Sequence, residues 1–402
     1  MPSRPQPTAL RAVQTWLQSF TPGQLKLLVR EADSPALLVL IQALTLLLRP
    51  GVGLTPAEIR LYGLHRRQST GEGGRAESYL GEAAWAMICR RLNRGSNRLL
   101  SKKLSLSYLL AGSRLGGPRT LAYLGVTPPL LAVPALHTGP ELVRFLRQAP
   151  YPLFIKPLHG SQGQGCLAIE ALDDGELLLG DGQRLPLQQA AVTLRHRLGR
   201  QAIVQERIQP HPCLQKVCGK TCATVRLLSS CEGHAVKVLA AILKLPTAGA
   251  MVDNLHAASE RHPVTLAPVN PQTGEIGPWR QFNGACSTPV EAPLSLARIP
   301  DWPAFLDTVQ TLHQLDRGAL LLGWDVAVSL SGPMLVEVNG LPGIDLWQLA
   351  WGRGFRDASG RRLLSELEAR ARQIRHRRWR RAGRWLALLR PGWAPAGARR
   401  AG

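Results

Sequence analysis

A glycine-rich loop between two short apolar segments limits the folds that this chain can adopt. Residues 152–157 (PLFIKP) have the pattern of a strand that ends near a lysine, residues 160–165 (GSQGQG) that of a flexible loop, and residues 166–169 (CLAI) that of a second strand. A Rossmann or P-loop site would need a helix directly after the loop, and a P-loop would also need Gly-Lys-Ser/Thr. The sequence therefore predicts a strand–loop–strand unit and neither of those two folds.

The loop and its lysine suit a ligand that carries phosphate. The N–H groups of a glycine-rich loop can reach phosphate oxygens because no Cβ atoms block a close approach. Lys156 would add a positive charge beside them. The alternative is an ordinary hairpin turn beside a solvated lysine.

Two later strands place carboxylates opposite each other. The segments GWDVAVS and MLVEVN flank a Gly-Pro turn, and a hairpin centred on Ser331 would pair Asp325 with Glu337. Opposed Cβ atoms lie about 5 Å apart, where two carboxylates repel unless a cation lies between them. Mg²⁺ prefers carboxylate and amide oxygens, and Asn339 shares a face with Glu337. We therefore predict a magnesium site at these three residues, with a solvated hairpin face as the alternative.

Two cations lie inside apolar segments. Arg226 belongs to the segment 224–227 (TVRL), and Lys244 belongs to the segment 241–245 (AILKL). A charge within such a strand is costly unless it is paired or faces a cleft. The guanidinium of Arg226 suits a carboxylate or a phosphate because its fork can bind two oxygens. A structural ion pair with a buried acid is the alternative.

The segment 202–208 (AIVQERI) is an apolar strand that becomes polar at its end. It enters the linker Gln-Pro-His-Pro, so Gln205 and Glu206 could form a hinge that binds the edge of an adenine. The alternative is a strand that simply reaches the surface.

Helical and strand patterns occupy different parts of the chain. Residues 1–98 are mainly helical in pattern, and Thr55-Pro56-Ala57-Glu58 is typical of a helix start. Strand patterns dominate from 151 to 338, with helices expected at 187–198 and 303–316. A length of 402 residues, 45% of them apolar, allows two or three domains with real cores.

Half of the excess positive charge lies in the last 42 residues. Residues 361–402 hold 13 Arg, no Lys and two Glu, a net charge of +11 out of +22 for the chain. An Arg-rich helix over 363–389, with Trp379 and Trp385, would suit an anionic membrane surface or a polyanion such as nucleic acid. A solvated or disordered tail is the alternative.

The sequence indicates a cytoplasmic protein without a transmembrane segment, at most peripheral at the inner membrane surface. The longest apolar run, 35–48, has about 14 residues, whereas a membrane span needs about 20. The N-terminus lacks a signal-peptide pattern, and an odd number of cysteines, seven, indicates free thiols. Four cysteines cluster without a Cys-x-x-Cys pair, so small buried side chains are favoured over zinc ligands: Cys213, Cys218, Cys222 and Cys231.

The order of these segments resembles the ATP-grasp superfamily. More narrowly it is similar to the sugar-transfer associated ATP-grasp group, which is related to the alpha-L-glutamate ligase-like proteins. The resemblance covers about residues 99–355 and rests on the joint order of motifs that are unspecific one by one. The narrower match consists of Val204-Gln205-Glu206 with His211-Pro212, Thr224-Val225-Arg226, Val252-Asp253-Asn254, Gln272-Thr273-Gly274 and Gly323-Trp324-Asp325-Val326.

The resemblance implies an α+β fold in which two subdomains, about 99–208 and 209–360, clasp ATP. A helical region, 1–98, would precede them and the basic tail, 361–402, would follow. The implied cofactors are ATP and Mg²⁺. The implied reaction turns a carboxylate into an acyl phosphate, which an amine or hydroxyl then attacks, and the family name suggests polysaccharide or glycoconjugate biosynthesis. The carboxylate and the nucleophile are not identified by the sequence.

The resemblance also implies roles for single residues. Arg226 and Lys244 would stabilise the transferring phosphoryl group or the acyl phosphate, and Asp325, Glu337 and Asn339 would hold Mg²⁺. The implied nucleotide-binding residues are Lys103, Lys156, Gly160, Ser161, Gly163, Gly165, Gln205 and Glu206.

The sequence departs from the family pattern at three places, one of which is the tail from Arg361, which has no counterpart in the family. Ser101-Lys102-Lys103 has no acid before its lysines, and the segment 255–259 (LHAAS) is not rich in glycine as it is in relatives, so the acceptor stays open. Two other functions remain as alternatives: an ATP-grasp kinase that phosphorylates a small-molecule hydroxyl, and a non-enzymatic ATP-binding protein whose tail binds nucleic acid or a membrane.

Overall fold

The computed structural model divides the chain into two compact units, Met1–Asp357 and Ala358–Gly402. In the second unit the chain is helical over residues 360–373, and the remainder of the helix expected at 363–389 lies outside the described residues. The described residues are 21–32, 40, 46, 52–65, 76–111, 116–127, 133–159, 165–199, 201–246, 249, 258–259, 261–357 and 360–373.

Helices open the first unit, as expected for residues 1–98. Thr55 begins one of them with a reciprocal capping box, in which its hydroxyl accepts from the Glu58 N–H and the Glu58 carboxylate accepts from the Thr55 N–H. This confirms the predicted helix start, whereas most of the apolar run 35–48 lies outside the described residues. The helices and the short 3₁₀ turn are α2 (Pro22–Arg30), α4 (Pro56–Leu61), η2 (Ala76–Ser78), α5 (Glu82–Leu92) and α6 (Lys103–Ala111).

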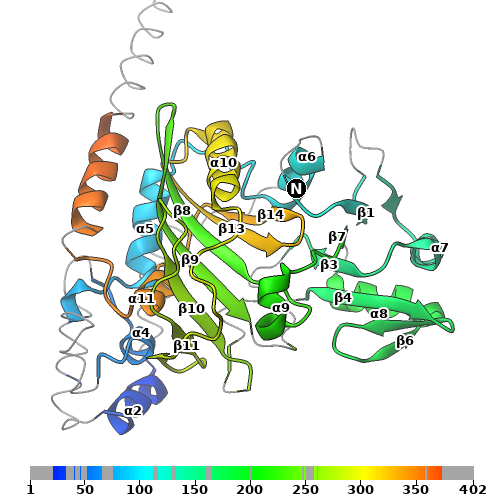
Figure 1. Cartoon of the computed structure of the whole chain (residues 1–402), viewed down its shortest axis with the longest axis horizontal. Coiled ribbons are helices and arrows are strands. Elements are labelled where there is room, and N and C mark those ends of the chain that lie inside the picture. The colour runs from blue at the N-terminus through cyan, green and yellow to red at the C-terminus, as the bar shows by residue number, and fades with distance from the viewer. Residues whose placement is uncertain are drawn as a thin grey trace, which may run out of the picture. The chain divides into compact units, whose positions relative to one another are not determined.

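The described strands form two seven-stranded sheets, which we call sheet A and sheet B (Figure 1). Sheet A has the order β2-β1-β7-β3-β4-β5-β6, in which β1 and β2 are parallel and the other neighbours are antiparallel. Its strands are β1 (Thr120–Leu124), β2 (Ala135–Leu136), β3 (Leu153–Pro157), β4 (Leu167–Asp173), β5 (Glu176–Leu179), β6 (Arg184–Pro186) and β7 (Ala202–Glu206). The helices of this part are α7 (Gly139–Gln148) and α8 (Leu187–Leu198).

One face of sheet A packs against α7 and α8, and the other carries polar groups. Leu153 and Ile155 of β3 share a buried core with Leu146 of α7 and Leu194 of α8. Because side chains alternate along a strand, Phe154 and Lys156 point to the opposite face. The strand–loop–strand prediction is confirmed here, since β3 and β4 pair in antiparallel fashion around the loop.

Sheet B has the order β12-β11-β10-β9-β8-β13-β14, and all its neighbouring strands are antiparallel. Its strands are β8 (Thr224–Glu232), β9 (Ala235–Pro246), β10 (Val264–Val269), β11 (Arg280–Phe282), β12 (Ser287–Pro289), β13 (Leu321–Ser329) and β14 (Gly332–Asn339). The helices of this part are α9 (Pro212–Cys218), α10 (Trp302–His313), the 3₁₀ turn η4 (Gln314–Asp316) and α11 (Asp345–Trp351).

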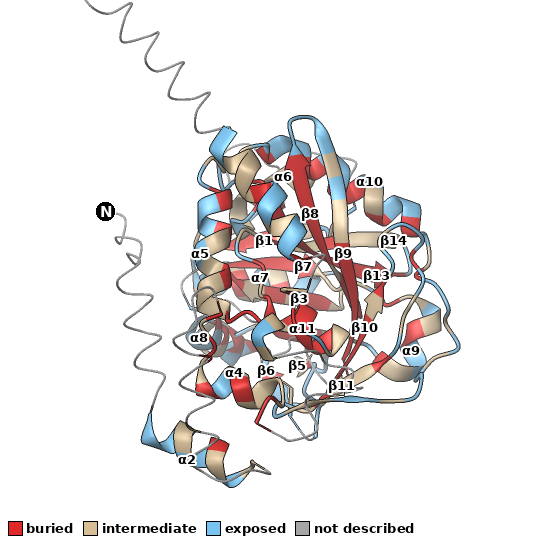
Figure 2. Ribbon diagram, turned by 90° about the vertical axis from the view of Figure 1, so that its left-hand side faces the viewer, coloured by how far each residue is buried: buried red, intermediate tan, exposed pale blue. Residues whose placement is uncertain are grey.

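The outer face of sheet B packs into a large apolar core. Val225, Leu243 and Val326 lie on this face and share the core with Phe305 and Val309 of α10. Figure 2 shows β8, β9 and β13 as largely buried strands. The residues that alternate with this apolar set lie on the inner face of sheet B, and they include the cations and carboxylates singled out above.

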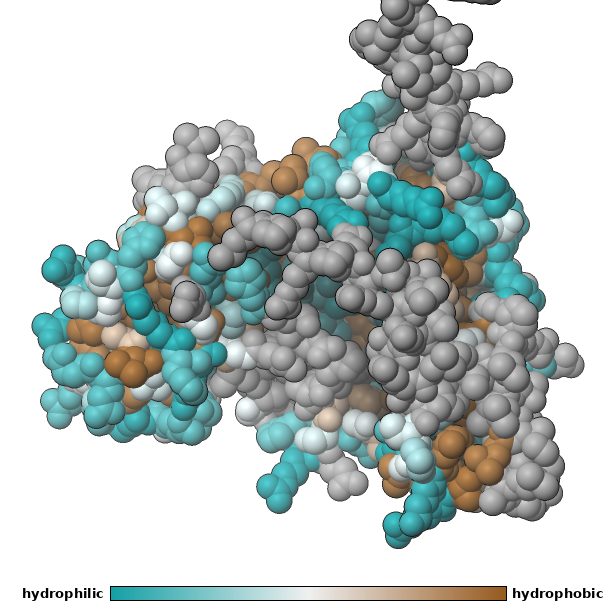
Figure 3. All heavy atoms as spheres, turned by 180° about the vertical axis from the view of Figure 1, so that it is seen from behind, coloured by the Kyte–Doolittle hydropathy of each residue, from teal (hydrophilic) through white to brown (hydrophobic). Residues whose placement is uncertain are grey.

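The surface around α7 and α8 is mainly hydrophilic (Figure 3). Arg144 and Arg147 of α7 are exposed there, and Val192 of α8 is a single exposed apolar side chain. Within the residues described, no helix combines the length and apolar character that crossing a membrane would require.

Candidate active site

The inner face of sheet B holds a compact ionic cluster around Asp325. The Arg226 guanidinium donates to both carboxylate oxygens, with Nε 2.8 Å from Oδ1 and Nη2 2.7 Å from Oδ2. The Lys244 ammonium lies 3.1 Å from Oδ1, and the Asn339 amide donates to Oδ2 over 3.2 Å. The strands β8, β9, β13 and β14 thus bring together four of the residues that the sequence predicted.

The predicted pairing of Asp325 with Glu337 is present, but the hairpin that produces it differs from the expected one. Ser329 pairs with Gly332, so the turn consists of two residues rather than being centred on Ser331. A register shift next to Asp325 then compensates, because Val336 is an extra residue on β14. Bulges of this kind re-aim side chains near functional sites. The bulge turns Glu337 toward the inner face.

The two carboxylates have opposite electrostatic environments. Burial by itself would raise the pKa of Asp325, but the charges of Arg226 and Lys244 outweigh it and hold that pKa well below its usual range. For Glu337, burial raises the pKa, and the negative charge of Asp325 raises it further. Lys103, Arg226 and Lys156 act in the other direction on Glu337. A cation bound beside Glu337 would favour its charged form.

Lys156 and Lys103 lie near enough to Glu337 for their charges to lower its pKa. Burial lowers the pKa of Lys156 to about 8, and the neighbouring charge of Lys103 contributes while Glu337 opposes the change. The Lys103 ammonium donates to the carbonyl oxygen of Pro157 over 3.1 Å, which fixes α6 to the end of β3. The charges of Lys103 and Lys156 also act on the thiol of Cys166, but burial outweighs them and raises its pKa. The structure therefore gathers both predicted lysines near the predicted metal-binding carboxylate.

A cavity of about 500 Å³ lies beside this cluster, between sheet A and sheet B. Its size is within the range of small-molecule binding sites. Thr224 and Ala327 line it from the inner face of sheet B, two residues from Arg226 and Asp325 on their strands, so the cavity and the cluster share that face. The apolar lining includes Pro118, Phe154, Ala168, Leu178, Leu179, Ile208, Ala327 and Val336.

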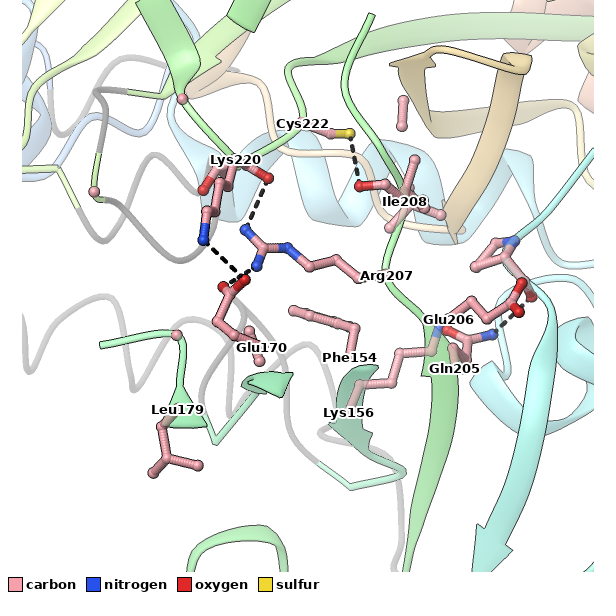
Figure 4. Close-up of a pocket in the computed structure, with 18 of the residues that line it drawn as sticks. Phe154, Lys156, Glu170, Leu179, Gln205, Glu206, Arg207, Ile208, Lys220 and Cys222 are labelled. Atoms are coloured by element: carbon pink, nitrogen blue, oxygen red, sulfur yellow. Dashed lines mark hydrogen bonds and ion pairs between the residues drawn. The ribbon is translucent and has the colours of Figure 1, made fainter. Parts of the chain in front are cut away.

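An ion-pair network that the sequence did not indicate borders the cavity (Figure 4). The Glu170 carboxylate accepts from the Arg207 guanidinium and, over 3.1 Å, from the Lys220 ammonium. Arg207 also donates to the Lys220 carbonyl oxygen over 2.8 Å, and the Cys222 thiol donates to the Ile208 carbonyl oxygen over 3.4 Å. Glu170 stands inside an otherwise apolar strand, and that position is the one sequence signal that could have indicated a paired group.

The structure also places three of the predicted nucleotide-binding residues: Gln205, Glu206 and Gly165. Gln205 and Glu206 line the cavity; the Gln205 amide donates to Thr120 over 3.3 Å, and Glu206 forms an exposed ion pair with Arg119. Gly165 has a positive φ of 73°, a conformation that favours glycine. Gly160, Ser161 and Gly163 lie outside the described residues, so their predicted role stays a prediction.

The donor set around Glu337 fits a hard divalent cation. The side chain of Glu337 forms no hydrogen bond or ion pair with the described residues, and Asn339 directs its NH₂ group toward Asp325, which leaves its Oδ1 atom on the other side. Carboxylate and amide oxygens are the ligands that Mg²⁺ prefers, with phosphate and water completing the shell.

A second kind of metal site, made of at least three His, Cys, Asp or Glu residues, is absent from the described part of the chain, and its seven cysteines are free thiols.

Two sheets that enclose a cavity, with Lys156 on sheet A and the opposed carboxylates of Asp325 and Glu337 on sheet B, define an α+β nucleotide-binding class, the ATP-grasp fold. The model of the family described as sugar-transfer associated ATP-grasp matches residues 93–361, more than half of the chain. The chain therefore belongs to the sugar-transfer associated ATP-grasp family, and the resemblance inferred from the motifs is confirmed. A comparison with curated proteins gave no match.

Among solved structures, the chain is similar to the VanG D-Ala:D-Ser ligase from Enterococcus faecalis, with 13% identity and a TM-score of 0.36. That match covers 72% of this chain and 63% of the ligase, so the chain spans less than two thirds of its length. It is also similar to the D-alanine–D-alanine ligase from Bacillus anthracis, with 14% identity, a TM-score of 0.38, and coverage of 70% of this chain and 72% of the ligase.

Proposed function

We propose that this protein is an ATP-dependent ligase that activates a carboxylate as an acyl phosphate and transfers the acyl group to an amine or a hydroxyl. The observation that carries the proposal is the ionic cluster of Asp325, Arg226 and Lys244 beside the cavity, with Glu337 opposite Asp325, in a chain of this family. The family description associates its members with sugar transfer, which supports a role in polysaccharide or glycoconjugate biosynthesis.

The charge balance of the site supports a phosphate-bearing substrate. Four cations stand against two carboxylates within it: Lys103, Lys156, Arg226 and Lys244 against Asp325 and Glu337. An excess of positive charge in a partly buried site favours triphosphate and stabilises charge that develops on a transferring phosphoryl group. A nearby phosphate would also raise the pKa of Lys156 from its depressed value and so keep that side chain charged.

Each group of residues at the site would have a separate role. Lys156 and Lys103 would bind the nucleotide phosphates, while the polypeptide at Gln205 and Glu206 would border the adenine. Glu337 and Asn339, with Asp325 beside them, would hold Mg²⁺, which when bound neutralises phosphate charge. Arg226 and Lys244 would orient the carboxylate and stabilise the acyl phosphate. The apolar lining of the cavity would limit access of water.

The first test is nucleotide binding measured as a thermal shift. Mg-ATP at about 100 times its dissociation constant should stabilise the protein by about 2.7 kcal/mol. The shift should fade with EDTA and in the Glu337→Gln protein, because both remove the metal that links carboxylate and phosphate. Glu275→Gln, which changes an exposed ion pair with Arg298, is the matched control and should keep the full shift.

A flat response to Mg-ATP in the wild-type protein would rule the nucleotide site out. If the shift is present, analysis of products with candidate substrates separates the ligase from an ATP-grasp kinase. Only the ligase forms a new acyl bond, whereas the kinase forms a phosphate ester.

We also propose that residues 361–402 attach the protein to an anionic membrane surface. The net charge of +11 in this segment supports the proposal, because each basic residue near such a surface contributes about 1 kcal/mol. The full chain should sediment with phosphatidylglycerol vesicles at low salt, and less as salt rises. The chain cut after residue 360 should stay in solution, as should the full chain with phosphatidylcholine vesicles. Equal sedimentation of both chains would contradict the proposal, and preferential binding to DNA would replace the membrane with a polyanion.

A further inference from the structure

We propose that Asp325 is a positioning residue that holds Arg226 and Lys244 until the metal–nucleotide arrives, and that its transfer to the metal releases both cations for the acyl substrate. This inference rests on the proposed function and adds an order of binding to it. The nucleotide with its metal would bind first, and the carboxylate or acyl phosphate would find its cationic partners only afterwards.

The first support is that the Asp325 carboxylate is saturated. An ionised carboxylate has about four lone-pair sites on its two oxygens. Oδ1 accepts from Arg226 at 2.8 Å and from Lys244 at 3.1 Å. Oδ2 accepts from Arg226 at 2.7 Å and from Asn339 at 3.2 Å. A metal ion can therefore bind Asp325 only if one of these donors leaves.

The second support is the shielding of the cluster from water. The side chains of Asp325 and Lys244 are each 7% exposed, and that of Arg226 is 15% exposed. Water therefore cannot replace a lost partner at little cost, and each cation keeps its carboxylate until another anion takes over. Arg226 and Lys244 are thus both held by Asp325 in the nucleotide-free protein.

The third support is the contrast with Glu337, which lies opposite Asp325 in the neighbouring strand. Its carboxylate forms no ion pair or hydrogen bond with the described residues, in contrast to the four donors around Asp325. A divalent cation can bind Glu337 and the Oδ1 atom of Asn339 without displacing a donor. From there it competes for Asp325, because a dication beside this carboxylate repels Arg226 and Lys244 at short range.

We call this change of partners at Asp325 the exchange. It predicts that Mg-ADP strengthens the binding of a second anion to the site, rather than weakening it. Mg-ADP carries net negative charge, so simple repulsion would weaken the binding of a second anion to the site. Release of Arg226 and Lys244 has the opposite effect, because it supplies two new partners for that anion. Inorganic phosphate, a product of the proposed reaction, is a suitable probe of the released cations.

The experiment is calorimetric titration of the full chain with inorganic phosphate in three states: alone, with ADP and EDTA, and with saturating Mg-ADP. We expect phosphate affinity to rise about tenfold with Mg-ADP and not with ADP and EDTA, a coupling of ordinary size between linked sites. Lys244→Gln should lose most of the rise, because one of the released cations is missing. Lys237→Gln, the same change at an exposed position of β9, should keep it.

The outcomes separate the exchange from the proposed function. If Mg-ADP itself does not bind, the proposed function fails and the exchange fails with it. If Mg-ADP binds but phosphate affinity is equal in all states, falls, or is undetectable throughout, the exchange alone is wrong. A rise that survives in Lys244→Gln would mean that phosphate binds the metal directly, which would also overturn the exchange.

Discussion

The Asp325→Asn substitution is expected to lower the free energy of unfolding by about 3–5 kcal/mol. The reason is that it removes the carboxylate that pairs with two buried cations. Arg226 and Lys244 both lie within hydrogen-bond distance of Asp325, and the Asp325 residue is only 5% exposed. Asparagine keeps the shape of the side chain but offers one weaker acceptor and an NH₂ group that faces the guanidinium. Urea denaturation near pH 7 measures the change.

The pH dependence of this loss provides its control. The folded pKa of Asp325 lies below the ordinary value of 3.8, so its stabilising contribution is present above that value and is lost as pH falls through the acid range. The deficit of Asp325→Asn should therefore shrink toward low pH. Asp173→Asn, at an exposed ion pair with Arg184, should cost less than about 1 kcal/mol at any pH. If Asp325→Asn also lowered the free energy of unfolding by less than about 1 kcal/mol, the ionic cluster would contribute little to stability.

Local sequence patterns sufficed for the elements that carry the site. The alternation in TVRL and AILKL predicts strands with one cation each, and the structure has both as β8 and β9. The two interpretations of Arg226, a ligand for substrate or a partner for a buried acid, turn out to be linked, since its partner Asp325 is itself a predicted metal ligand. The sequence could not show this, because Arg226 and Asp325 are 99 residues apart.

Long-range geometry explains the features that the sequence did not predict. The bulge at Val336 has no composition signal, because nothing in MLVEVN distinguishes a regular strand from a bulged one. The network of Glu170, Arg207 and Lys220 joins β4 to the segments that follow β7 and α9, and no short motif contains it. Only the folded chain brings these charges to one side of a cavity.

The Glu82→Gln protein is expected to be more stable than the wild-type protein at pH 8 and equally stable at pH 4. Burial, with the negative charges of Asp345 and Glu58, raises the pKa of Glu82 from 4.5 to about 7. The folded state thus holds a proton that the unfolded state has lost, so wild-type stability falls as pH rises from about 4.5 to about 7. At about 1.4 kcal/mol per pH unit, the loss amounts to about 3–4 kcal/mol at most.

Glutamine at position 82 removes this loss because it stays neutral and can still accept the Ile344 N–H, which now donates to the Glu82 carboxylate over 2.9 Å. Urea denaturation of both proteins from pH 4 to pH 8 measures the difference, in which contributions common to the two proteins, such as that of Asp325, cancel. Glu77→Gln, at an exposed position five residues earlier, is the control and should show no such trend. A difference that stays constant across this range would mean that Glu82 titrates at its ordinary pKa. The burial of Glu82, at the start of α5 and against the loop before α11, would then contribute nothing to the pH dependence of the free energy of unfolding.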